Sequence, residues 1–362
     1  MKLYYNNKIN IKSNKLCWLT FQLINMPKLF HSCLKMSLYR IQNFSFALFV
    51  INLINLELSS CLAHMSFSKI STKDKLGPYL AGLIEGDGHI YVPSEKRNSK
   101  GKKNFPHIEI AFDIKDLLLF EKIKDTLKGG FITIRPNKKS GRLTFRKKSV
   151  LTILINLING HFRTPKIEAL HRLIDWYNEE NKKDFDFIPK LSLDTTSILD
   201  NSWLSGFIDA DGNFYLNWKR NKKFKIINII YYMRIYQKEF YSRKVNLDIK
   251  ESNFDIMSKI AENVKSSVKF IIRNRLKYIE KGYLVRTDKR ISKDILFSYL
   301  YKNPLFGYKC YLWLILEEIH LLLRNRNNKK ENKVEKLLIS YCNQNKGLKI
   351  NNWSHLKKFY NI

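Results

Sequence analysis

A short phrase that occurs twice constrains this chain more than any other feature. The first copy runs Leu80-Ala-Gly-Leu-Ile-Glu-Gly-Asp-Gly88, and the second runs Leu204-Ser-Gly-Phe-Ile-Asp-Ala-Asp-Gly212. Each is an apolar stretch with small residues four positions apart, ending in acidic residues and a glycine. Small residues one helical turn apart let two helix backbones approach closely. The repeat therefore predicts two helices packed side by side with their acidic ends together.

The last acid of each copy is the candidate for chemistry. Asp87 and Asp211 lie 124 residues apart, so only a repeated fold brings them together. Two carboxylates at helix C-termini repel each other and the helix dipoles, and a hard divalent cation such as Mg²⁺ relieves that repulsion. A single copy would favour a helix C-cap, but the matched pair favours a metal site.

The rest of the chain is strongly basic. Its 362 residues hold 65 Lys and Arg against 32 Asp and Glu, a formal net charge of +33. Such an imbalance requires a polyanionic partner, either nucleic acid or an anionic membrane surface. Because the basic residues are spread through both copies, we expect a folded nucleic-acid-binding surface rather than a basic tail. A basic surface around an acidic centre indicates a nuclease.

The first 70 residues differ from the remainder and are predicted to lie outside the fold. No acidic residue precedes Glu57, and this basic, partly apolar leader resembles a mitochondrial import sequence. It is equally explained as a dispensable leader, translated because the reading frame is open upstream. The uncharged run between Arg40 and Glu57 is 16 residues long, which is short of a membrane span, and we predict no transmembrane helix. The five cysteines show no zinc-like spacing, and we expect them to be reduced.

From residue 71 onward the chain is predicted to be one unit used twice. The expected divisions are a first half over 71–180, a linker over 181–200, a second half over 201–324 and a charged, peripheral tail over 325–362. Alternating apolar residues predict strands, and longer apolar stretches predict helices. In the first half, strands are expected over 89–92, 107–115, 131–135 and 142–148, and helices over 116–127, 151–158 and 166–178. In the second, strands are expected over 214–218, 226–236, 268–273 and 283–287, and helices from 292 to 323.

Both phrases resemble the motifs of the LAGLIDADG homing endonucleases, specifically the monomeric two-motif type encoded in organellar group I introns. The likeness includes Leu76-Gly-Pro-Tyr ahead of the first copy, Ser202-Trp ahead of the second, and Leu157-Ile-Asn-Gly-His-Phe-Arg-Thr-Pro-Lys-Ile-Glu-Ala-Leu170. It spans roughly residues 76 to 324. It implies an α+β fold of two pseudo-symmetric αββαββα halves, with saddle-shaped antiparallel sheets and the motif helices packed at the interface.

The resemblance also implies roles for particular residues. Asp87 and Asp211 would bind Mg²⁺ or Mn²⁺, helped by the carbonyls of Gly86 and Ala210, whereas Glu85 would have a structural or helix-end role, as would Asp209. A water-positioning residue after the second strand of each half corresponds to Asp116 and Gln237. A basic residue after the fourth strand corresponds to Lys148 and Lys289. Asp116 is also explained as a helix N-cap, and the two lysines as surface charges.

Polar side chains that alternate with apolar ones define a predicted DNA face on each sheet. Any one of them is more readily a phosphate contact or a solvated residue than a base reader. The loop 96–104 is expected to follow the phosphate backbone. The predicted face consists of His89, Tyr91, His107, Glu109, Asp113, Lys115, Arg142, Thr144 and Arg146 in the first half, and Tyr215, Asn217, Arg234, Tyr236, Arg273 and Arg286 in the second.

The sequence leaves three functions open. The leading one is a site-specific, metal-dependent double-strand DNA endonuclease that acts as a monomer in the mitochondrion, or otherwise in the chloroplast. The second is an RNA maturase that assists splicing of its own group I intron, with or without cutting DNA. The third is a DNA-binding regulator that has lost catalysis. The intact Asp87 and Asp211 count against the third and do not decide the second.

Overall fold

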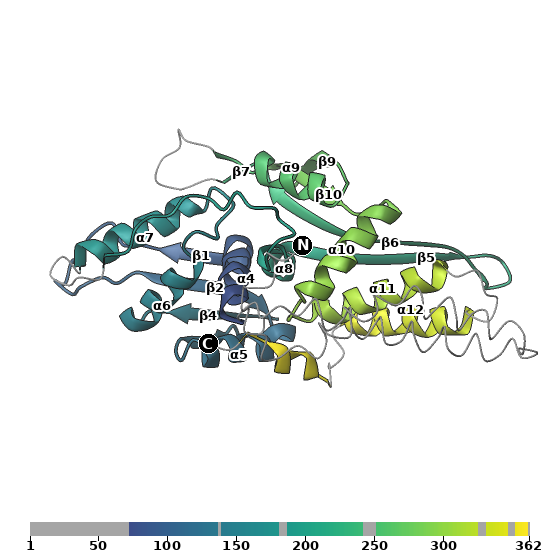
Figure 1. Ribbon diagram of the computed structural model, residues 1–362, viewed down its shortest axis with the longest axis horizontal. Helices are drawn as coiled ribbons and strands as arrows, with labels where there is room; N and C mark the ends of the chain where they lie inside the picture. The colour runs from purple at the N-terminus through teal and green to yellow at the C-terminus, as the bar shows by residue number, and fades with distance from the viewer. Residues whose placement is uncertain are drawn as a thin grey trace, which may run out of the picture. The chain divides into compact units, whose positions relative to one another are not determined.

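The computed structural model describes residues 72–136, 139–180, 187–241, 251–324, 331–346 and 352–360. All of them belong to one compact unit, Ile70–Ile362 (Figure 1). The leader predicted over residues 1–70 lies outside the described residues. Within these ranges no helix is long and apolar enough to cross a membrane.

The described unit is α+β and contains the two αββαββα halves that were predicted. The first half comprises α4 (Thr72–Asp87), β1 (Gly88–Tyr91), β2 (His107–Asp113), the 3-10 helix η1 (Ile114–Asp116), α5 (Leu117–Thr126), β3 (Phe131–Ile134), β4 (Ser140–Phe145), α6 (Lys148–Ile158) and α7 (Ile167–Glu180). The second comprises α8 (Trp203–Asp211), β5 (Gly212–Arg220), β6 (Ile226–Lys238), β7 (Phe240–Tyr241), β8 (Glu251–Ser252), α9 (Phe254–Asn263), β9 (Val268–Asn274), β10 (Ile279–Arg286), α10 (Arg290–Lys302) and α11 (Lys309–Arg324).

The two main sheets share one topology. Their strand orders are β1-β2-β4-β3 and β5-β6-β10-β9, and every pairing is antiparallel. In each half the motif helix runs directly into the first strand, at Gly88 and at Gly212. The acidic end of each motif helix is therefore held at the start of its own sheet.

The motif helices α4 and α8 lie side by side between the strands of the two halves (Figure 1). A Cβ atom added to Gly82 would lie 2.1 Å from Trp203 O, and one added to Gly206 would lie 1.9 Å from Tyr79 O. Both distances are too short for any side chain, so only glycine permits this approach of the two backbones. The glycines of the repeated phrase thus form the seam between the halves, as predicted.

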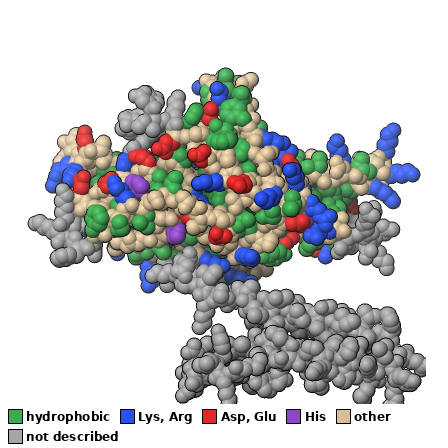
Figure 2. Space-filling model, turned by 45° about the horizontal axis from the view of Figure 1, so that its top comes forward, with side chains coloured by type: hydrophobic (Ala, Val, Ile, Leu, Met, Phe, Trp, Pro, Cys, Tyr) green, Lys and Arg blue, Asp and Glu red, His purple; other side chains and the backbone are tan. Residues whose placement is uncertain are grey.

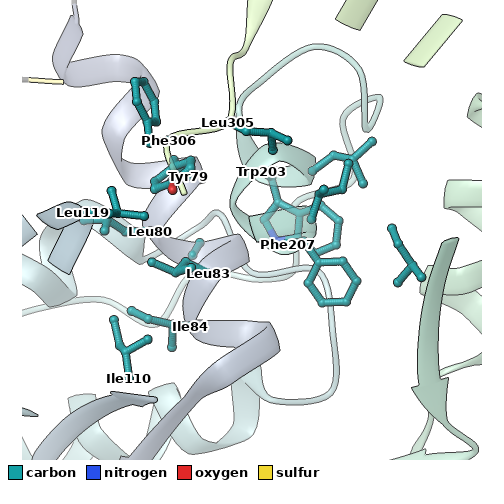
Figure 3. Close-up of a cluster of buried hydrophobic side chains, with 14 of the residues drawn as sticks. Tyr79, Leu80, Leu83, Ile84, Ile110, Leu119, Trp203, Phe207, Leu305 and Phe306 are labelled. Atoms are coloured by element: carbon teal, nitrogen blue, oxygen red, sulfur yellow. The ribbon is translucent and has the colours of Figure 1, made fainter. Parts of the chain in front are cut away.

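Large apolar side chains fill the space around this seam (Figure 3). Tyr79, Leu80 and Ile84 from α4 and Trp203 and Phe207 from α8 are all completely buried. Trp203 and Phe207 stack with ring centroids 4.7 Å apart. Burial of each such side chain stabilises the fold by about 1.5–3 kcal/mol. The seam is therefore part of the hydrophobic core, and it also holds the acidic helix ends in place.

Several elements differ from the expectations. The helices expected from 292 to 323 are α10 and α11, and they are separated at Pro304, which lacks the N–H that a continuous helix needs. Helix α9 is the middle helix of the predicted αββαββα order, but no residue range was predicted for it. The tail expected to be peripheral contributes α12 (Glu331–Asn345) and η3 (Ser354–Lys358). It also buries Tyr341, whose hydroxyl donates to Phe214 O, together with Phe359 and Tyr360.

Candidate active site

Asp87 and Asp211 meet at the C-terminal ends of the motif helices. A Cβ atom on Gly86 would lie 2.3 Å from Ala210 Cβ and 2.9 Å from Asp211 Oδ2. The end of α4 therefore presses against the end of α8 and its carboxylate. The structure brings together the two acids that the repeat predicted would be neighbours.

The surroundings of these acids oppose their ionisation. Asp87 keeps exposed surface, yet its carboxylate is partly desolvated. This burial, followed by the charge on Asp211, raises the pKa of Asp87 to about 6. Burial also raises the pKa of Asp211, although a hydrogen bond from Gln237 and the charges of Lys309 and Lys166 act in the opposite direction. Two partly desolvated carboxylates of like charge favour a bound cation.

Two lysines sit at the same helix ends, one from each half. Lys166 Nζ donates to the carbonyl oxygens of Glu85 at 2.6 Å and Gly86 at 3.3 Å, among others. Lys309 Nζ donates to the carbonyl of Ala210 at 2.7 Å and to two preceding carbonyls of α8. A cation at a helix C-terminus is favourable because it satisfies orphan carbonyls and opposes the helix dipole. Each ammonium group also lowers the pKa of Asp87.

Lys166 and Lys309 were missed from the sequence, where Lys148 and Lys289 were chosen instead. Lys148 begins α6 and lies over the Tyr177 ring, with Nζ 5.8 Å from its centroid. Lys289 is exposed and precedes α10. Neither contributes to the shifted pKa of Asp87 or Asp211. The sequence did hold a signal for these two lysines, because they occupy equivalent positions in the two halves. Lys166 directly precedes α7, and Lys309 is the first residue of α11.

Gln237, the residue expected to position water in the second half, contacts one of the two final aspartates. Its Nε2 donates to Asp211 Oδ2 at 2.7 Å. Strand pairing corrects the counterpart proposed in the first half: Gly88 pairs with Ile110, and Gly212 pairs with Ile235. Two residues further along, the position equivalent to Gln237 is therefore occupied by the apolar Phe112 and not by Asp116.

Asp116 ends η1 and is buried. Its Oδ1 accepts a hydrogen bond from Tyr308 N at 2.5 Å, and it does not cap α5 through its side chain. Burial, followed by the charge on Asp209, raises the pKa of Asp116 to about 7. Asp116 and Asp87 nevertheless line one pocket of about 140 Å³, together with Asp113, Asp209 and Lys309.

The earlier acid of each motif anchors the loop that carries the lysine. Glu85 accepts hydrogen bonds from Arg163 N at 2.9 Å, Thr164 N at 2.6 Å and, across the seam, Trp203 Nε1 at 2.5 Å. Burial raises the pKa of Glu85 to about 7.

Asp209 repeats this arrangement in the second half. It accepts from Phe306 N at 2.9 Å, Gly307 N at 3.2 Å and, across the seam, Tyr79 Oη at 2.8 Å. The structural role expected for the earlier acids agrees with these contacts. Of the four motif acids, Asp87 and Asp211 are the less buried pair.

On the first sheet, part of the predicted DNA face is exposed. His89 and Tyr91 are accessible, and the Tyr91 ring stacks on His107 with centroids 4.9 Å apart. Arg142 pairs with Glu109 at 3.0 Å. Arg146 lies over the ring of Phe131, 5.5 Å from its centroid.

Two residues of that predicted face, Thr144 and Lys115, do not match the expected strand pattern. Thr144 is 3% exposed, because its neighbours on β2 and β3 cover it. The strand ends at Asp113, whose side chain accepts from Lys115 N at 2.9 Å. Lys115 thus belongs to η1, where its Nζ lies 4.8 Å from the centroid of the Tyr308 ring.

The second sheet carries cations stacked on tyrosines. Tyr215 and Tyr232 stack with centroids 4.8 Å apart, and Arg286 lies 4.5 Å above Tyr232. Arg234 flanks Tyr215, Arg273 lies 4.1 Å above Tyr236, and Asn217 is exposed. Beyond them, the β5–β6 turn exposes Arg220, Lys222, Lys223 and Lys225. Figure 2 shows Lys and Arg side chains gathered toward the end where Figure 1 draws this turn.

The donor set at the seam suits a hard cation. It comprises two carboxylates and the carbonyl oxygens of Gly86 and Ala210, each of which retains a lone pair beside its lysine hydrogen bond. Among the residues described, no group of three or more His, Cys, Asp or Glu side chains is placed to hold a metal. A cation at the seam would therefore need further oxygens from water or from phosphate.

Comparison with known proteins gives a consistent result. The LAGLIDADG endonuclease family matches residues 80–177 and 204–320. The intron-encoded DNA endonuclease aI3 of Saccharomyces cerevisiae is 32% identical over 309 residues, covering 79% of this chain and 74% of that protein. The intron-encoded RNA maturase bI4 of the same yeast is 29% identical over 178 residues, covering 49% of this chain and 25% of the maturase.

Solved structures share the fold. The I-SmaMI LAGLIDADG homing endonuclease bound to cleaved DNA superposes with a TM-score of 0.51 at 18% identity, covering 76% of this chain and 98% of that chain. The meganuclease I-AabMI bound to uncleaved DNA gives a TM-score of 0.50 at 21% identity, covering 72% and 96%. The two motif regions, the paired aspartates and the repeated sheets establish that the chain belongs to the LAGLIDADG endonuclease family.

Proposed function

We propose that this protein is a site-specific endonuclease that hydrolyses both strands of a DNA target, with divalent metal, preferably Mg²⁺, bound between Asp87 and Asp211. The contact of the two motif-helix ends carries this proposal, because it joins one carboxylate from each half at a single place. The sheets on either side supply two unlike surfaces, which suits a long and asymmetric target.

The surface chemistry supports a duplex as substrate. The net charge of +33 favours a polyanion, and arginines stacked on tyrosines offer donors to phosphates and base edges. The similar endonucleases I-SmaMI and I-AabMI are bound to cleaved and to uncleaved DNA, respectively. We infer that a monomer of this chain binds double-stranded DNA across both sheets.

The chain's own groups have separable roles in this chemistry. The bound cation would polarise the scissile phosphate and make water more acidic. Asp87 and Asp211 would hold the cation at the seam between the two halves. Gln237 fixes the orientation of the Asp211 carboxylate and has a second N–H with which to orient a water molecule. The ammonium groups of Lys166 and Lys309, held on the carbonyls at the two helix ends, would add positive charge beside the reacting phosphates.

The test uses a duplex that spans the insertion site of the protein's own gene. With Mg²⁺ we expect both strands to be cut, and we expect Asp87→Asn to bind the duplex but not to cut it. Asp255→Asn is the matched control, because that acid is exposed on α9. If the wild-type protein binds the duplex but does not cut it with any divalent cation supplied, the proposal is overturned.

A second candidate is an RNA maturase for the host intron. The similarity to the yeast maturase bI4 favours it, although this similarity covers a quarter of that protein. Splicing of the host intron in vitro, with and without the protein, distinguishes the two functions. Stimulated splicing that survives Asp87→Asn would assign the protein a maturase activity that is independent of the seam acids.

We also propose the mitochondrion as the site of action. The similar proteins include the yeast aI3 endonuclease and a protein of a cox1 intron of Schizosaccharomyces pombe, which is 30% identical over 160 residues. Fractionation of cells that express the chain with a C-terminal tag tests this location. Recovery outside the mitochondrial fraction would contradict it.

A further inference from the structure

We propose that the C-terminal segment Trp353–Tyr360 positions the lysine loop of the second half, so that cutting of one DNA strand depends on this segment. We call this segment the C-terminal strap and define the second lysine loop as Leu305–Lys309. The proposal rests on the DNA cleavage proposed above. It assigns a function to a part of the chain that lies beyond both motif regions.

The strap binds the back of the loop that Asp209 holds from the front. Asp209 accepts from the N–H groups of Phe306 and Gly307. On the other side, His355 Nε2 lies 3.0 Å from Phe306 O, and His355 Nδ1 lies 3.3 Å from Tyr311 Oη. A carbonyl can only accept, so Nε2 carries the proton and donates to Phe306, while Nδ1 accepts from the tyrosine. Phe306 is thus held through both its N–H and its C=O.

Aromatic packing holds the same residue. The Phe306 ring contacts Phe359 and Tyr360 edge-to-face, with centroids 5.0 and 5.1 Å apart, and contacts Tyr79 of α4 at 5.5 Å. All four rings are buried, with at most 4% of any side chain exposed. Such pairs contribute about 0.5–1.5 kcal/mol each beyond the area they bury. The strap therefore fixes the loop against the motif helix of the other half.

The first half holds its own lysine loop with different chemistry. Arg163 occupies the position of Phe306, three residues before the lysine. Its guanidinium donates to Asp194 Oδ2 at 2.7 Å and to Thr196 O at 2.5 Å, and Asp194 N donates to Phe162 O at 2.8 Å. Asp194 and Thr196 lie in the segment that follows the first half, as the C-terminal strap follows the second. We call the segment Asp194–Thr196 the first strap. It holds its loop mainly through charged and polar groups, whereas the C-terminal strap uses mainly aromatic rings, so each can be weakened without changing the other.

A loosened strap would act on chemistry through Lys309. That lysine follows Phe306 by three residues, and its ammonium bridges the last carbonyls of α8, including that of Ala210 beside Asp211. Displacing a positioned group by about 1 Å can cost about 100-fold in rate. Strap residues do not contact the acidic centre themselves, so we regard them as positioning residues.

The experiment measures cutting of each strand separately. A target duplex labelled on both strands is cleaved in single turnover by His355→Ala and Phe359→Leu, with Ser354→Ala as the exposed control in the same segment. Lys309→Met and Lys166→Met identify which strand depends on which lysine. Asp194→Asn weakens the first strap for comparison.

We expect the two strap variants to slow the Lys309-dependent strand by about 10-fold or more, with nicked duplex accumulating and DNA affinity unchanged. Asp194→Asn should slow the other strand. Equal slowing of both strands, or no slowing, would overturn the positioning role.

Hydrogen exchange provides a second measurement that does not depend on cleavage. Amides of Phe306–Lys309 should exchange faster in His355→Ala, and those of Arg163–Lys166 should not change. Unchanged exchange in both loops would also refute the strap, whereas an inactive wild type with this exchange pattern would refute only the nuclease function.

Discussion

The two acids of each motif differ in what surrounds them, and this difference assigns their roles. Glu85 and Asp209 are buried, and each receives three hydrogen bonds, two of them from its own lysine loop. Asp87 and Asp211 retain access to solvent. Both oxygens of Glu85 accept hydrogen bonds, whereas Asp209 accepts all three at Oδ2 and its Oδ1 is buried without a hydrogen-bond partner among the described residues. What separates both earlier acids from Asp87 and Asp211 is therefore their burial. The final aspartates are therefore the pair that can bind a cation.

The raised pKa of Asp87 predicts a pH limit for metal binding. A cation requires the ionised carboxylate, and in the free protein Asp87 takes up a proton below about pH 6. We therefore expect the affinity for Ca²⁺, measured by calorimetry without DNA, to fall by about tenfold per pH unit below that value. An affinity that stays constant on acidification would contradict the proposed ligand.

Asp116 offers a stability test of the opposite kind. Its pKa in the folded chain, about 7, is higher than the ordinary value of 3.8, so folding favours the protonated form. Stability from this group is greatest at low pH and is lost as pH rises through about 4 to 7. Asp116→Asn keeps the acceptor for Tyr308 N and removes the buried charge. At about pH 8 the variant should be more stable by about 1–3 kcal/mol in urea unfolding, with no gain at about pH 4.

A variant equally stable or less stable than the wild type at the higher pH would show that Asp116 is ionised without a cost in stability.

The sequence could not predict the buried environment of Asp116. It identified Asp116 by alignment with Gln237, but η1 interrupts the strand alignment and turns the carboxylate toward Tyr308 of the second half. Lys166 and Lys309 were missed for a related reason, because only the folded loops bring them to helix ends 79 and 98 residues earlier in the chain.

The motif helices unite the fold with the site. Their contact depends on Gly82 and Gly206, each of which faces a backbone carbonyl of the other helix. The repeated phrase predicted this contact because a spacing of small residues is a local property. The same pattern could not predict α9 or α12. The apolar residues of those helices, such as Ile260 and Leu338, are buried by residues that are distant in the sequence, and a local pattern does not reveal such contacts.

Gly206→Ala should disrupt the seam. The added methyl group would lie 1.9 Å from Tyr79 O, so the helices must separate. We expect a loss of about 3 kcal/mol or more in the free energy of unfolding, because overpacking against backbone cannot be relieved by a rotamer change. Gly101→Ala is the control: no atom lies within 4 Å of the added methyl, and its φ of 74° limits the cost to backbone strain of about 1 kcal/mol. Equal losses in the two variants would contradict close packing at the seam.

The unit as a whole combines one acidic centre with a basic exterior. Strand pairing gives both sheets the same order, yet their polar faces differ: histidines and a Glu109–Arg142 pair on one, tyrosines beneath arginines on the other. The sequence predicted the two sheets and the sign of the charge. Which side chains are exposed depends on cross-strand neighbours, as buried Thr144 illustrates.

This charge distribution predicts strongly salt-dependent DNA binding. If six or more phosphates are contacted across the two faces, the affinity for a target duplex should fall by about 10³-fold between about 50 and 200 mM salt. Fluorescence anisotropy with an Asp87→Asn protein, which we expect to bind without cutting, measures this directly. A change of less than about tenfold would indicate that the sheets do not follow the DNA backbone.

Single-turnover cleavage by Asp87→Asn, Asp211→Asn and the double variant tests most directly whether the two acids form one shared centre. If they do, each single variant should lose double-strand cutting by about 10³-fold or more, and the double variant should be little worse than either, because groups that act as a unit are not additive. DNA affinity should be retained in all three. A single variant that still makes double-strand breaks at near the wild-type rate would contradict a metal centre shared between the halves.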